Sequence, residues 1–186
     1  MSAMTRPNRV RVGLWSFAAA LLLVPAVAMR FTAEVNWSVL DFAFAAIMLA
    51  MAGGAAEIFV RRANGRAYMA GAALMIFGAF FLVWVNLAVG IIGSEQNGAN
   101  LLYAGVVAVV VGGAIVSRVR SAGLMRTCVA AATLQALIGL AAVTVGWGAD
   151  GPIWPHDVIG VTAILVAIWL GAAALFARAT RDQARR

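Results

Sequence analysis

Apolar residues fall into six long runs along the 186-residue chain, each bounded by charged or turn residues. A helix of about 18 apolar residues is long enough to cross the hydrocarbon core of a bilayer, which is about 30 Å thick. The pattern predicts an all-α integral membrane protein, a bundle of six transmembrane helices that forms one domain over residues 1–186. The predicted helices are approximately 12–29, 37–59, 67–92, 100–116, 124–145 and 158–177.

The amino-acid composition also indicates that most of the protein surface faces lipid. The chain is 64% hydrophobic and 11% charged, whereas a soluble domain carries about 25% charged residues. The six runs leave no stretch long enough for a separate soluble domain.

The net charge of +7 comes from 14 basic residues, all of them arginine. Thirteen lie before the first run, in the connections 61–66 and 118–126, or in the tail 178–186. Positive residues in alternate short connections mark the cytoplasmic side. We therefore expect a multi-pass protein of the bacterial cytoplasmic (inner) membrane with both termini in the cytoplasm. No basic patch with interleaved aromatics suggests nucleic acid as a partner.

The first run allows a second interpretation. Arginines, an apolar stretch and then Ala26-Val27-Ala28 would also suit a cleaved signal peptide. We favour a retained helix, in which Pro25 near the outer end is a tolerated kink.

Most acidic residues fall on the predicted outer side, whereas Glu57 lies on the inner side at the i, i+4 spacing that favours an ion pair with Arg61. Asp41 is predicted one turn inside the second helix, where a carboxylate exposed to lipid would cost roughly 3 kcal/mol. Asn86 is predicted at a similar depth in the third helix. Two roles follow for Asp41: a hydrogen bond with Asn86, or the floor of an acidic cavity that binds a cation or proton.

The connection between the third and fourth helices is the most polar part of the chain. Its glycine and asparagine suit a C-cap at Gly93 and an N-cap at Asn100. Oxygen-rich loops also ligate calcium or magnesium, but the EF-hand spacing is missing and we expect no metal. The candidate ligand or ion residues on the outer side are Glu34, Asn36, Asp41, Asn86, Glu95, Asn97, Asn100, His156 and Asp157.

Five polar, aromatic or reactive residues have structural interpretations. Asp157 is a predicted N-cap of the last helix and Trp154 an interfacial anchor. His156 could sense pH, although a single histidine at a membrane boundary is more often solvated. Gln135, near the middle of the membrane, is expected to form an interhelical hydrogen bond. The single cysteine, Cys128, is expected to be a small buried hydrophobe.

Catalytic signatures are missing from the sequence. There is no serine–histidine–acid order, zinc ligand set, phosphate loop or acidic pair with an attendant base. We expect no enzymatic activity and no cofactor.

Two stretches carry a resemblance to known proteins. Glu34-Val35-Asn36-Trp37 with Asp41-Phe42, and the segment 83–95 (VWVNLAVGIIGSE) continuing through Asn97, Asn100 and Tyr103, resemble a widespread family of small uncharacterised bacterial polytopic inner-membrane proteins. The family pattern has an acidic residue and a proline where this chain has Gln96 and Gly98. The resemblance implies no activity, but it points to the same outer-side residues.

Two functions remain open from the sequence. The first is a non-enzymatic accessory or assembly component that acts through helix–helix contacts in the bilayer, with itself or another membrane protein as partner. The alternative is a small transporter, channel or sensor with an acidic cavity open to the periplasm.

Overall fold

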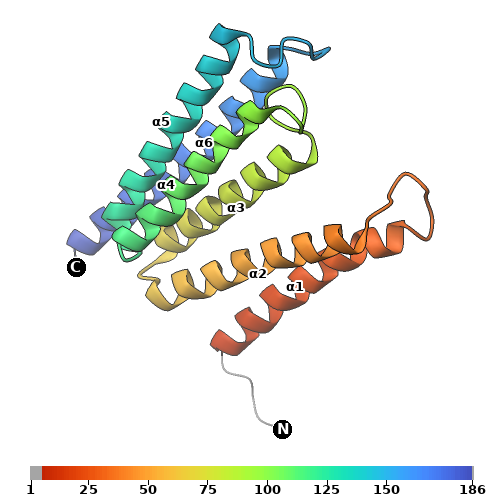
Figure 1. The fold of residues 1–186 in the computed structure, drawn as a ribbon. Coiled ribbons are helices and arrows are strands. Elements are labelled where there is room, and N and C mark those ends of the chain that lie inside the picture. Colours follow the sequence, from red (N-terminus) through yellow and green to blue (C-terminus); the bar gives the residue numbers. More distant parts are fainter. Residues whose placement is uncertain (1–5, 186) are drawn as a thin grey trace. The chain divides into compact units, whose positions relative to one another are not determined.

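The structure is a computed structural model that describes residues 6–185, and all regular structure in this range is helical. The chain divides into two compact units, residues 1–58 and 59–186. Figure 1 shows the course of the helices within each unit. The helices are α1 (Arg6–Ala28), α2 (Val39–Arg62), α3 (Arg66–Ala88), the short 3-10 helix η1 (Gly98–Leu102), α4 (Tyr103–Val116), α5 (Ser121–Val145) and α6 (His156–Ala184).

Five helical segments are long and apolar enough to cross a membrane: α2, α3, η1 with α4, α5, and α6. In α1 the apolar part, Trp15–Ala28, is shorter. The predicted all-α membrane fold with six α-helices is confirmed, and among the described residues five of the six predicted transmembrane helices are long and apolar enough to span.

Residues 59–186 form a bundle in which α3, α4, α5 and α6 run side by side, and α6 packs against both α5 and α3 (Figure 1). Glycines permit the close packing. A Cβ on Gly78 of α3 would lie 3.2 Å from the Trp169 ring of α6, and a Cβ on Gly139 of α5 would lie 2.7 Å from Thr162 Cγ2 of α6. Small residues allow helix backbones to approach closely in lipid, where packing drives association.

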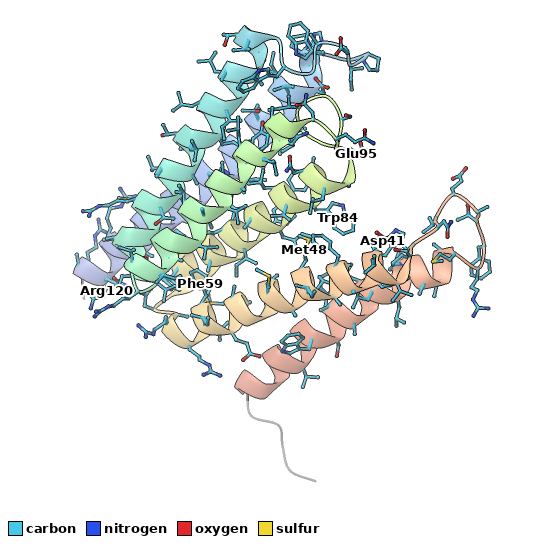
Figure 2. All side chains as sticks on the ribbon, in the orientation of Figure 1. Asp41, Met48, Phe59, Trp84, Glu95 and Arg120 are labelled. Atoms are coloured by element: carbon cyan, nitrogen blue, oxygen red, sulfur yellow. The ribbon has the colours of Figure 1, made fainter. Side chains whose placement is uncertain are left out.

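The two ends of this bundle differ in charge. Glu95, between α3 and η1, and Arg120, between α4 and α5, lie at opposite ends (Figure 2). We call the first the acidic end, because Asp150 and Asp157 follow α5 and begin α6 there. The second is the arginine end, and its described arginines are Arg61, Arg62, Arg66, Arg118, Arg120, Arg126, Arg178, Arg181 and Arg185.

The arginine end is held by hydrogen bonds between separate connections. The Tyr68 hydroxyl donates to the Val119 carbonyl at 2.7 Å. The buried Ser121 hydroxyl accepts from Asn64 Nδ2 at 3.4 Å and from Gln183 Nε2 at 3.3 Å. These contacts join the α2–α3 connection, the start of α5 and the end of α6. Because the residues are far apart along the chain, their spacing in the sequence does not predict these contacts.

Candidate functional site

Asn100 organises the acidic end. Its side chain is only 4% exposed. Oδ1 accepts from the backbone N–H groups of Ile91 at 3.0 Å and Ile92 at 2.9 Å, while Nδ2 donates to the carbonyls of Ile92 at 3.3 Å and Ser94 at 2.7 Å. One side chain therefore meets four backbone groups that lie outside any helix.

This arrangement corrects two predictions for the loop. The third helix ends at Ala88 rather than Ile92, and Gly90, with φ +74°, follows the C-cap residue Val89 in place of the expected Gly93. Asn100 is not an N-cap. Asn97 takes that role for η1 by accepting a hydrogen bond from the Ala99 N–H at 3.0 Å.

Two glycines bring the loops of the acidic end into backbone contact. A Cβ on Gly148, which follows α5, would lie 2.6 Å from the backbone nitrogen of Gly93. Both residues have positive φ, +81° and +73°. The 89–97 loop and the 146–155 loop are therefore packed against each other, with no room for a side chain at Gly148.

The remaining candidates of the bundle lie at this same end. Asn86 Nδ2 donates to the Asn100 carbonyl at 3.2 Å, and Glu95 is exposed. His156 is exposed at the start of α6. Asp157 is not the N-cap, because Pro155 occupies that position. Asp157 instead accepts from the N–H of Val158 at 2.8 Å, inside the first turn.

Asp41, in the first unit, lies in a capping box at the start of α2. The Asp41 carboxylate accepts from the Ser38 N–H at 2.7 Å and from the Ser38 hydroxyl at 2.8 Å, while the Ser38 hydroxyl accepts from the Asp41 N–H at 3.3 Å. Because α2 begins at Val39 rather than Trp37, Asp41 lies in the first turn and is exposed. The prediction that it lies about one turn inside the helix is wrong, and with it the argument that its depth in the membrane requires protein or water around the carboxylate.

The other candidates of this unit precede the cap. Glu34 and Asn36 are exposed, and the Glu34 N–H donates to the Thr32 hydroxyl at 3.1 Å. Asp41 hydrogen-bonds to Ser38 within its own unit. Asn86 donates through Nδ2 within the bundle, while its Oδ1 has no hydrogen-bond partner.

Glu57 has a partner that the sequence did not suggest. Its carboxylate accepts from the Trp15 indole N–H at 3.0 Å, which joins α1 to α2. The two residues are 42 positions apart, so helical spacing in the sequence cannot predict this hydrogen bond.

Gln135 departs from its predicted role. It is fully buried in α5, as expected near the middle of a bundle, but neither atom of its amide group has a hydrogen-bond partner. The predicted interhelical hydrogen bond is therefore not formed. Cys128 is buried, as predicted.

No group of three or more histidine, cysteine, aspartate or glutamate side chains with metal-binding geometry occurs among the described residues. In comparisons with known proteins, no protein-family model matches the chain, and no curated protein or solved structure is detectably similar to it. The functional argument therefore rests on the residues of this chain.

Proposed function

We propose that this protein is a non-enzymatic accessory or assembly component of the bacterial inner membrane that acts by binding another transmembrane helix. The observation that carries the proposal is a row of small side chains on the outer surface of α4. Ala104 and Ala108 are exposed and Gly112 is partly exposed, and the three are spaced four residues apart. This spacing places them on one helix face.

The surroundings of this row favour a helix as the partner. A Cβ at Gly112 would have no neighbour within 4 Å, whereas one at Gly113 would meet the Thr127 side chain of α5. Gly113 thus packs inside the bundle, and Gly112 belongs to the surface beside it. Small residues at four-residue spacing let two helices approach closely, and close packing is the main attraction between helices in lipid.

The polar residues at the helix ends support the same proposal, because several already have structural partners. Asp41 and Asp157 hydrogen-bond near helix starts, Asn97 caps η1, and Asn100 holds the 89–97 loop. Their polar atoms stabilise local backbone, which weakens the case for an acidic ligand cavity built from them.

Substitution of Gly112 tests the proposal. Gly112→Leu places a large side chain in the row without a clash inside the bundle, so it should remove the complex seen by native mass spectrometry after purification in mild detergent. Gly160→Leu on α6 is the matched control, because Gly160 is exposed and a Cβ there, as at Gly112, would have no neighbour within 4 Å. A wild-type protein that is strictly monomeric and brings no other protein with it would contradict the proposal, as would an intact complex in Gly112→Leu.

The second candidate is a transporter, channel or sensor. The observation that favours it is not the acidic cavity that the sequence suggested. Several polar atoms inside the bundle lack partners, although none belongs to an acidic residue. These atoms support a binding site for an uncharged molecule more than an acidic cavity.

A further inference from the structure

The unpartnered polar atoms of the bundle lie between its acidic end and its middle. Among the described residues, the buried side-chain atoms without a hydrogen-bond partner are Asn86 Oδ1, the Tyr103 hydroxyl, Gln135 Oε1 and Nε2, Trp154 Nε1, the Thr162 hydroxyl and Trp169 Nε1. Asn86, Tyr103, Trp154 and Thr162 lie near the acidic end, within about two turns of a helix terminus or in the 146–155 loop. Gln135 and Trp169 lie deeper, near the middle of α5 and α6.

The arginine half of the bundle differs. The buried polar residues there, Ser121 and Thr127, are hydrogen-bonded, and so is the buried hydroxyl of Tyr68. The unpartnered atoms are therefore not spread evenly along the bundle. Native proteins leave few such groups unpaired, and an unobserved water or ligand is a common explanation.

Packing contacts connect these groups across three helices. Gln135 and Gly139 are one turn apart on α5, and Gly139 faces Thr162 of α6. Thr162 interacts with Tyr103 of α4, although neither hydroxyl reaches a hydrogen bond of normal length and angle. Trp169 is two turns from Thr162 along α6 and is fully buried. The polar atoms thus extend from the acidic end toward mid-depth.

The chemistry of these atoms restricts what kind of molecule can bind to them. Trp169 offers only a donor, Gln135 offers both a donor and an acceptor, and the two hydroxyl groups can do either. No charged side chain is buried among the described residues of the bundle. An ion would therefore lose its hydration without gaining a counter-charge, which is costly in an apolar interior.

We propose that the bundle holds a buried polar site, lined by Tyr103, Gln135, Thr162 and Trp169, for a small uncharged molecule that both donates and accepts hydrogen bonds. Water is the smallest molecule of this kind, and a small amide or alcohol has the same chemistry. Asn86 and Trp154 add two further unpartnered atoms at the acidic end.

Nuclear magnetic resonance of the full chain in detergent micelles tests the site directly. The protein is labelled with ¹⁵N-tryptophan, and the Trp169 indole signal is assigned by its loss in Trp169→Phe. An occupied site should give a magnetisation-transfer peak between water and this fully buried N–H. Thr133→Val, on the lipid-facing side of α5, is the control and should leave the peak unchanged. Titration with formamide distinguishes a site for a small amide from a site for water. Loss of the water peak with a shift of the indole signal indicates the amide site, and no change indicates the water site.

Thermal unfolding of Gln135→Leu provides the independent measurement. If a bound molecule satisfies the amide group, leucine removes those hydrogen bonds and the midpoint should fall. If the amide is buried dry, leucine removes an unsatisfied polar group and the midpoint should rise. A rise in the midpoint together with no water peak at Trp169, with or without formamide, would overturn the proposal.

Discussion

The Asn100 side chain forms two hydrogen bonds with the backbone of Ile92, accepting from its N–H at 2.9 Å and donating to its carbonyl at 3.3 Å. Since Ile92 is fully buried and lies beyond the end of α3, its backbone would otherwise be left without partners in the interior. The side chain of a residue eight positions later thus replaces the hydrogen bonds that a longer helix would have supplied.

Asn100→Ala should therefore be strongly destabilising. It leaves the N–H groups of Ile91 and Ile92 unpaired, at a cost of roughly 3 kcal/mol in unfolding free energy, since each buried unsatisfied group costs about 1–3 kcal/mol. Asn97→Ala is the matched control, because it removes one capping hydrogen bond worth about 1 kcal/mol. Equal losses of stability for both variants in reversible unfolding would show that Asn100 does not hold the loop.

Asp41 provides the second prediction. Asp41→Ala and Ser38→Ala should each speed hydrogen exchange of the backbone amides at the start of α2, because either change opens the capping box. The effect should be confined to that first turn. Asn36→Ala, at an exposed position just before the cap, should leave those rates unchanged. An exchange rate that responds to added cations in wild type, and not in Asp41→Ala, would favour a ligand role for this carboxylate instead.

The apolar runs alone predicted the all-helical architecture, because span length and hydropathy act locally along the chain. The ends of the helices are harder to predict from the sequence. The run through Ile91 and Ile92 is as apolar as a helix, so hydropathy does not predict that α3 ends at Ala88. The end depends on Gly90 and on a hydrogen-bonding side chain that lies beyond the loop.

Candidate site residues were recognised by polarity, but their roles depended on geometry. A helix that begins at Trp37, as the apolar run predicts, places Asp41 inside it. The observed start at Val39, two residues later, makes the carboxylate a capping group. The contact between Tyr103 and Thr162 joins residues on separate helices. No periodicity in one helix could have predicted it.

Two adjacent glycines of α4 should respond differently to the same change. At Gly113 a Cβ would crowd the Thr127 side chain of α5, with Cγ2 at 2.5 Å, whereas a Cβ at Gly112 would meet nothing within 4 Å. Gly113→Ala should cost about 1–3 kcal/mol through overpacking, while Gly112→Ala should be neutral or stabilise by up to about 1 kcal/mol through helix propensity. Thermal unfolding of both variants in one detergent checks the difference. Similar midpoints would contradict the close α4–α5 contact.

The last prediction concerns orientation in the membrane. We expect Gly65 to lie in the cytoplasm and Gly98 in the periplasm, since arginines surround the first position and Glu95 lies near the second. The two glycines flank α3, whose 23 residues span about 34 Å at 1.5 Å each, enough to cross a bilayer. Both positions are exposed and a Cβ there would meet nothing within 4 Å, although the φ of +158° at Gly65 is strained for a side chain. The native Cys128 is buried, so a membrane-impermeant maleimide should report only the introduced thiol. In intact spheroplasts Gly98→Cys should be labelled, and Gly65→Cys should be labelled only after permeabilisation. Labelling of both from one side would mean that α3 does not cross the membrane, and the reverse pattern would mean that the arginine end faces the periplasm.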